Sequence, residues 1–274
     1  DTVLLEVEEW GRNVSTIRST SKKDASEMIL KPDPVEGQIT VSVDDERRWS
    51  LLVPETISCR ELALPECHVI PPNWSETATG RLVTQSFEEA RVRYECSIDI
   101  IDDGTLELML TVHNDRDEPM TDTEADFCCA CAYCVWNTPA DDVDRSWINP
   151  PFHGPRKEKN TDWADRSLIA TRDGMVAVAE INKHFPVPSN RVVPGKNIAD
   201  FPFIMCQSED RTEIFGIGWE RASRLFCAMC SCIHAVAWLG TIPADGSCTR
   251  RGRFYYAKTD PYQLLARFQR DFDL

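Results

Sequence analysis

Three cysteines and one histidine fall within eight positions of an otherwise apolar stretch, residues 227–234. Thiolate and imidazole groups are common zinc ligands, and a cysteine beside a histidine can act as a nucleophile. A third interpretation requires no chemistry, because free cysteine is among the residue types most often buried in protein cores. The segment is therefore a metal site, a nucleophilic site or the interior of a β-sheet.

The alternation of side chains along a strand predicts which of these groups lie together. Across residues 225–235, a period of two places Cys230, Cys232 and His234 on one face of a single strand. In a second cysteine cluster, at residues 127–134, the same period separates Cys129 and Cys131 from Cys128 and Cys134. Side chains two residues apart on a strand can share a zinc ion, so Cys232 and His234 are compatible with zinc if the second cluster supplies a thiolate.

The local sequence argues against both chemical uses of the cysteines. Structural zinc sites usually take their cysteines from tight turns, and the segments "CAMC" and "CACAYC" contain no turn residues. A cysteine nucleophile needs a neighbouring histidine or cation, and we expect His234 to be poorly placed for cysteines on its own strand. We therefore predict no metal ligands and no cofactor, and interpret the cysteines as unpaired, buried thiols. His234 itself is either a hydrogen-bonded core residue or a catalytic residue on a ligand-binding face.

The elements that would position these residues are mainly antiparallel strands. Residues 91–100 and 105–114 alternate apolar and polar side chains around a "DDG" turn, which predicts a hairpin. A second hairpin is predicted over residues 167–181, and further strands over 38–43, 213–219, 225–236 and 249–257. We predict an all-β fold, an antiparallel β-sandwich formed by a single domain over residues 1–274.

One segment, close to the C-terminal end of the sequence, has the pattern of a helix. In "DPYQLLARFQRDF", apolar side chains recur every four residues behind Asp260, which suits an N-cap, and a proline follows in the first turn. We expect this short C-terminal helix to cover an edge or an end of the sandwich.

A long segment at residues 137–167 lacks any strand pattern and is predicted to be an ordered, functional loop that acts as a lid. It carries His153 and Arg156, and Arg156 belongs to a local basic cluster that suits an acidic sugar. Tryptophans in and beside this loop and the cysteine strands can stack on sugar rings, and those predicted to bind substrate are Trp136, Trp147, Trp163 and Trp238. The alternative is that Trp147 and Phe152 only pin the loop to the body of the protein.

Composition excludes several classes of function. The 274 residues carry a net charge of −15, which argues against nucleic acid and anionic membranes as partners. No run approaches the roughly 20 apolar residues needed to span a bilayer, and the first residues, "DTVLLEVEEWGRN", lack the basic region followed by an apolar region that is typical of a signal peptide. Because the cysteines lie in strand-like contexts rather than in loops, we favour a cytoplasmic over a secreted location.

The segment "LELMLTVHNDRDEPMTDTEADFCCACAY" has a long strand ending in Asn114, a polar turn "DRDEP" and a following strand. Together with "CIHAVAWLGTIPADGSCTRRGRFYYA", it resembles the galactose mutarotase-like (aldose epimerase-like) superfamily, mainly over residues 105–257. The resemblance implies a mutarotase-like supersandwich with a carbohydrate ligand on its concave face. Aldose mutarotases carry a catalytic histidine after that turn, whereas this sequence reads "EADFCCACAY", so ring opening by that histidine is not predicted.

Our first hypothesis is a carbohydrate-active enzyme that acts on a sugar or an acidic oligosaccharide by epimerisation or elimination. Both reactions move a proton, and the predicted acid and base are His234 and His153, with Glu124 as the carboxylate partner. Arg156 would hold an anionic group. Two alternatives stay open: a non-catalytic carbohydrate-binding or interaction domain, and a metal- or thiol-dependent protein that uses the cysteine clusters.

Overall fold

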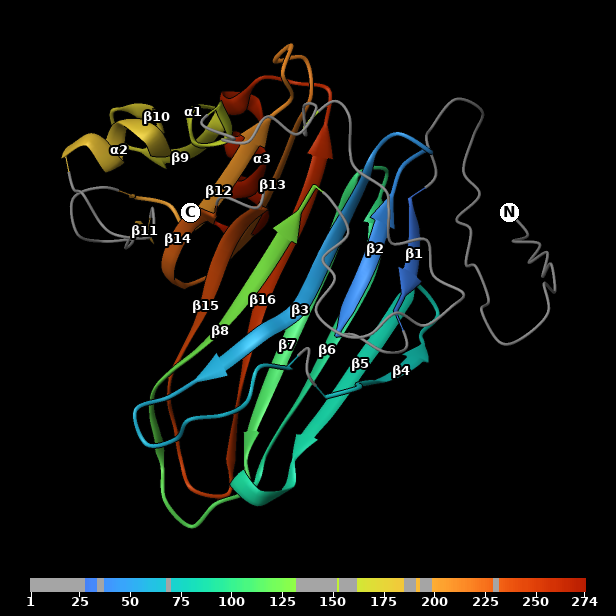
Figure 1. Ribbon diagram of the computed structural model, residues 1–274, viewed down its shortest axis with the longest axis vertical. Coiled ribbons are helices and arrows are strands. Elements are labelled where there is room, and N and C mark those ends of the chain that lie inside the picture. The colour runs from blue at the N-terminus through green and yellow to red at the C-terminus, as the bar shows by residue number, and fades with distance from the viewer. Residues whose placement is uncertain are drawn as a thin grey trace, which may run out of the picture.

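The structure is a computed structural model, which describes residues 28–33, 37–67, 70–131, 152, 162–184, 191–192, 199–228 and 232–274. Within these residues, the chain forms two antiparallel sheets, and the longest strands, such as β3 (Arg48–Ser58), β8 (Met120–Ala130) and β16 (Gly246–Ala257), run roughly along the long axis of the molecule (Figure 1). The predicted fold class, an antiparallel β-sandwich with a short C-terminal helix, is confirmed.

The first sheet has seven strands in the described part of the chain. Their spatial order is β1 (Ile29–Pro32), β2 (Gln38–Ser42), β3 (Arg48–Ser58), β8 (Met120–Ala130), β15 (Cys232–Ile242), β14 (Ala222–Ala228) and β11 (Arg191–Val192). Every neighbouring pair is antiparallel. The central strands β3, β8 and β15 therefore bring together segments that lie far apart in the sequence.

The second sheet has nine strands among the described residues. Their order is β10 (Gly174–Ala177), β9 (Ser167–Thr171), β12 (Phe203–Gln207), β13 (Ile214–Trp219), β16 (Gly246–Ala257), β7 (Thr105–Asn114), β6 (Val92–Asp102), β5 (Gly80–Phe87) and β4 (Asn73–Glu76). The predicted hairpin of residues 91–114 is confirmed as β6 and β7. Its alternation is visible in β7, where Leu106, Leu108 and Leu110 are fully buried.

Both sheets contribute side chains to one apolar core. Phe127 of β8 packs on Trp219 of β13 with ring centroids 4.6 Å apart, and Trp49 of β3 packs on Phe254 of β16 at 5.4 Å. Aromatic pairs of this kind stabilise a core beyond the area that they bury. We call the opposite side of each sheet, which is turned away from this shared core, its outer face.

The C-terminal helix α3 (Pro261–Phe272) forms as predicted, with the Asp260 side chain accepting hydrogen bonds from the first backbone N–H groups. Leu264, Phe268 and Phe272 are its buried residues, and Phe268 stacks on Phe203 of β12 at 4.5 Å. The helix thus packs on the outer face of the nine-stranded sheet rather than only along an edge or an end.

Two sequence-based boundaries are wrong. The second strand of the predicted hairpin at 167–181 stops at Ala177, and the chain continues as helix α2 (Val178–His184), beside the short helix α1 (Asp162–Arg166) at one end of the molecule (Figure 1). The single strand predicted at 225–236 is two antiparallel strands, β14 and β15, in which Cys227 pairs with Ile233. This reversal could not be predicted from the sequence, because the segment contains no glycine, proline or asparagine, the residues that usually mark a turn.

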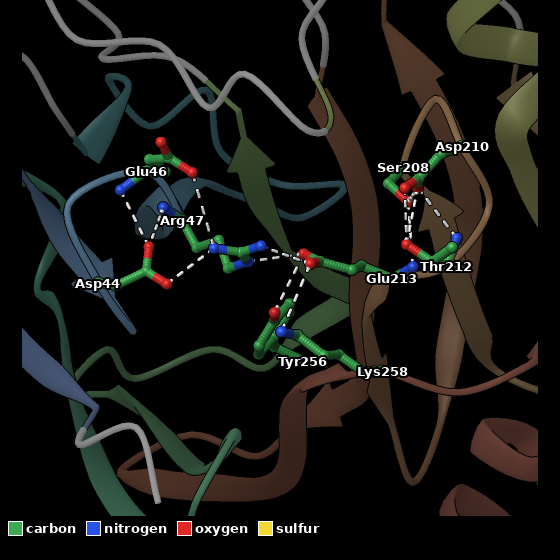
Figure 2. Close-up of polar contacts among 9 residues, drawn as sticks. All are labelled: Asp44, Glu46, Arg47, Ser208, Asp210, Thr212, Glu213, Tyr256 and Lys258. Carbon is green, nitrogen blue, oxygen red and sulfur yellow. Dashed lines mark hydrogen bonds and ion pairs between the residues drawn. The ribbon is translucent and has the colours of Figure 1, made fainter. Parts of the chain in front are cut away.

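An ion pair between the partly exposed Arg47 and the buried Glu213 joins the sheets near β3 and β13. Arg47 donates two hydrogen bonds to Glu213, at 2.8 and 2.6 Å, and the Tyr256 hydroxyl donates a third at 3.0 Å (Figure 2). Bidentate pairing of this kind fixes geometry as well as charge.

None of the helices in the described part of the chain is long and apolar enough to cross a membrane.

Candidate active site

His234 occupies the centre of the seven-stranded sheet and points to its outer face. It lies on β15, where its neighbours across the ladders are Cys128 of β8 and Phe226 of β14. The predicted alternation is confirmed for residues 233–235, because Ile233 and Ala235 belong to the shared core and His234 does not. Cys230, predicted to lie beside His234, is outside the described residues. His234 is only 5% exposed, so its ring nitrogens need partners.

Both ring nitrogens of His234 have partners. Nδ1 lies 3.0 Å from Oδ1 of Asp126 and 3.6 Å from Oε2 of Glu55. Nε2 lies 3.2 Å from the Sγ of Cys232. The Phe226 ring stacks on the imidazole, with centroids 4.2 Å apart and planes 13° apart. The imidazole is therefore held between a pair of carboxylates and a thiol.

An irregularity in β3 brings Glu55 to this position. The ladder between β3 and β8 passes from the Leu52–Cys128 pair directly to the Thr56–Asp126 pair, so β3 holds more residues than β8 over this interval. Pro54 has no N–H to donate, and such residues occur where a strand leaves its regular ladder. A bulge of this type redirects side chains, and here it carries the Glu55 carboxylate next to His234.

Glu55 has an incompletely bonded carboxylate. Its Oε2 atom is buried and forms no hydrogen bond in the described structure. Burial raises the pKa of Glu55 to about 7, an effect that the positive charge of His234 opposes and the negative charge of Asp126 reinforces. For His234, burial lowers the pKa, but the negative charge of Cys232 and the bond to Asp126 outweigh it and raise the pKa well above its ordinary value.

The predicted carboxylate Glu124 lies on the same outer face but does not contact His234. It accepts a hydrogen bond from the Ser223 hydroxyl at 2.7 Å and pairs with Arg224. The carboxylate that holds the imidazole is instead Asp126, two residues further along β8. Trp238 lies directly across the ladder from Glu124, half-buried and on the same face as His234.

Several predicted site residues lie outside the described part of the chain: His153, Trp136, Trp147, Arg156 and the side chain of Trp163. Phe152 of the predicted loop is described and is fully buried. It packs on Trp49 and Phe215, with ring centroids 5.8 and 5.0 Å away. At this residue, the segment is anchored to the core.

The expectation that His234 cannot serve a cysteine on its own strand is wrong. Cys232 and His234 are two residues apart, so their side chains leave the same face of β15 and come into contact. Glu55 and Asp126 were not predicted, although both are charged residues inside apolar strand segments, "LLVPET" and "EADFCCA". A charge in such a position is rarely buried without a partner or a function.

Comparisons with known proteins are limited to structure, since no family model and no curated protein sequence matches the chain. The fold is similar to a crystal structure described as a "putative aldose 1-epimerase" from Klebsiella pneumoniae subsp. pneumoniae MGH 78578. The TM-score is 0.39 at 8% sequence identity, and the match covers 91% of this chain and 58% of that one.

Proposed function

We propose that the protein is a carbohydrate-active enzyme that moves a proton at a sugar carbon or ring oxygen, by epimerisation or elimination. The observation that carries the proposal is the pair of carboxylates at one nitrogen of His234, 3.0 and 3.6 Å away. Proton transfer requires an acid and a base within hydrogen-bonding reach of the same reacting atom. A cluster of this kind favours an enzyme over a binding domain, which needs only polar contacts and stacking aromatics.

The two carboxylates suit different roles. Asp126 bonds Nδ1 of His234 and orients the ring, so it is a positioning residue. Glu55 keeps a buried oxygen without a hydrogen bond, which leaves that oxygen available to accept or deliver a proton. We assign Glu55 and His234 to proton transfer.

Features of the same face support a sugar as the substrate. Trp238 is half-buried beside Glu124, which suits an indole that stacks on the apolar side of a pyranose ring. Glu124 is fixed by Ser223 and Arg224 and can accept a hydrogen bond from a sugar hydroxyl. His153 as a second acid or base, Arg156 as the anion-binding group and residues 137–167 as a lid remain part of the proposal, as do the tryptophans Trp136, Trp147 and Trp163.

A proton-transfer screen in D₂O tests this proposal. Neutral aldoses, hexuronates and acidic oligosaccharides are incubated with the protein, and ¹H NMR follows anomer exchange, loss of C–H signals and new alkene protons. We expect one class to react, and we expect Glu55→Gln and His234→Ala to slow it at least about 100-fold. His113→Ala is the matched control, because His113 lies 3.8 Å from Glu95 on the other sheet.

Two results would overturn the proposal. No reaction across the panel, with saccharides shifting amide signals of the protein, would assign the face to a binding domain. A reaction that both variants retain at the wild-type rate would place the chemistry elsewhere.

A further inference from the structure

A second set of side chains meets at the other nitrogen of His234. The potential ligand atoms of Cys128, Cys232 and His234 all lie within 4.8 Å of one another. The three side chains are 2%, 0% and 5% exposed. Sheet register produces this cluster, because Cys128 lies directly opposite His234 and Cys232 precedes it by two residues on the same face. The weaker hypothesis from the sequence, zinc held by both cysteine clusters, requires this juxtaposition.

The ligand types and their spacing suit a soft divalent cation. Zinc binds cysteine sulfur at about 2.3 Å and histidine nitrogen at about 2.0–2.1 Å, so tetrahedral ligands lie roughly 3.5–3.8 Å from each other. The Sγ of Cys232 lies 3.2 Å from Nε2 of His234, close to that separation. A divalent cation would also neutralise two thiolates that are otherwise costly to bury.

The remaining nitrogen of His234 provides independent support. Metal-bound histidines usually donate their other N–H to a carboxylate, which fixes the ring and its tautomer. Nδ1 of His234 has that partner in Asp126, at 3.0 Å, and this leaves Nε2 directed at Cys232. A second group of potential ligands, Glu55, Asp126 and His234, shares the same ring but is occupied by this hydrogen bond.

We propose that Cys128, Cys232 and His234 bind one zinc ion or a similar soft divalent cation, with Asp126 as the carboxylate that orients the histidine. Three protein ligands leave a fourth position for water or a substrate oxygen, the arrangement of catalytic rather than structural zinc sites. A metal there would polarise a carbonyl or hydroxyl oxygen as a Lewis acid. That role rests on the proposed function, whereas metal binding does not. Because the metal would occupy Nε2 while Asp126 holds Nδ1, proton transfer in the metal-bound protein would fall to Glu55 rather than to His234.

Cobalt binding tests the site without any sugar. The full-length protein is treated with a chelator and titrated with Co²⁺ alone, and the absorption of tetrahedral cobalt and of thiolate-to-cobalt charge transfer is recorded. We expect one equivalent to bind and Zn²⁺ to displace it. Cys128→Ser and Cys232→Ser should each abolish the thiolate band or weaken it stepwise, and Asp126→Asn should lower affinity about 10- to 100-fold.

Cys206→Ser and Cys96→Ser are the matched controls, because both residues are fully buried in the shared core away from His234. Circular dichroism verifies that each variant is folded. Absence of a thiolate band in the wild type, or a band unchanged in the Cys128 and Cys232 variants, would overturn the metal site. Cobalt binding without sugar turnover would overturn only the proposed function, and turnover without cobalt binding would overturn only the metal site.

Discussion

At the scale of single residues, the unusual feature is a carboxylate buried without full hydrogen bonding. Glu55 Oε2 has no hydrogen bond among the described residues, and the negative charge of the nearby Asp126 adds to the cost of burying it. An unsatisfied buried polar group costs about 1–3 kcal/mol of stability. Proteins retain such costs at functional sites, where activity and stability are in conflict.

Replacing Glu55 by glutamine should therefore stabilise the fold. We expect Glu55→Gln to raise the free energy of unfolding by about 1–2 kcal/mol, because it removes a buried negative charge. Glu124→Gln, on the same face, should lower it by about 1–3 kcal/mol, because Glu124 is bonded to Ser223 and Arg224. Urea denaturation of both variants measures the difference. If Glu55→Gln loses as much stability as Glu124→Gln, the unsatisfied Glu55 carboxylate does not destabilise the fold. That result would contradict the view that it is retained for function.

Residue patterns predicted part of this site. The period of two placed His234 and Cys232 together on one face, and both occupy that face in the structure. The same pattern could not choose between Glu124 and Asp126, since residues two apart share a face and only the register with β15 decides which one meets the imidazole. Glu55 was beyond prediction, because its position depends on the irregular ladder between β3 and β8.

At the scale of elements, strands with regular alternation were predictable and turns without turn residues were not. The β6–β7 hairpin has a "DDG" turn and formed as expected. The reversal between β14 and β15 lies in a segment of small and apolar residues, so the two strands were merged into one. Strand β3 was missed entirely, because its buried run "RWSLLVPETIS" does not alternate.

The β2–β3 turn contacts the start of β13 and so joins the two sheets. This contact should contribute strongly to the free energy of unfolding. Glu213 is buried and accepts hydrogen bonds from Arg47 and Tyr256, so Glu213→Gln weakens both, although Arg47 keeps its exposed partner Asp44 (Figure 2). We expect a loss of about 1.5–3 kcal/mol in the free energy of unfolding. The control is Asp117→Asn, which neutralises an exposed partner of Arg91 and should cost less than about 1 kcal/mol. If chemical denaturation shows equal losses of stability for Glu213→Gln and Asp117→Asn, the less exposed pair does not stabilise the fold more than the exposed one, and the prediction is wrong.

The β12–β13 turn should be sensitive to acid. Hydrogen bonds from the Ser208 hydroxyl and from Thr212 lower the pKa of Asp210 to about 2 (Figure 2). A carboxyl with a depressed pKa in the folded state stabilises the protein above its unfolded pKa of about 3.9, and this contribution is lost as the pH falls toward 2. We expect Asp210→Asn to lower the melting temperature at pH 7, with the difference from wild type shrinking below about pH 4. A difference that stays constant with pH would contradict this assignment.

At the scale of the whole molecule, the two sheets share one core that contains most of the described cysteines. All ten described cysteines are free thiols, and only Cys59 and Cys248 are partly exposed. Burial raises the pKa of Cys206 and of Cys227 to about 12, so few of their thiolates form at neutral pH. The cysteines therefore serve mainly as core residues, with Cys128 and Cys232 as the exceptions.

Thiol counting tests this distribution. In the native protein at pH 8, we expect the described thiols to react slowly apart from Cys59 and Cys248, because burial blocks access and disfavours the thiolate. After denaturation with a chelator, all twelve cysteines of the sequence should react. A denatured count below half of that number would indicate disulfides and contradict the prediction of unpaired thiols.

The central claim is that the outer face around His234 is a catalytic site rather than a hydrogen-bonded part of the core. The most direct measurement compares His234→Ala with His113→Ala, using the saccharide that reacts fastest in the screen and the melting temperature of the same samples. We predict that His234→Ala loses at least about 100-fold in rate even at temperatures where the variant is fully folded, while His113→Ala keeps its rate. His234→Ala should also melt below wild type, because it leaves the partly buried carboxylates of Asp126 and Glu55 without their partner. A His234→Ala protein that melts much earlier but reacts at the full wild-type rate would contradict the account.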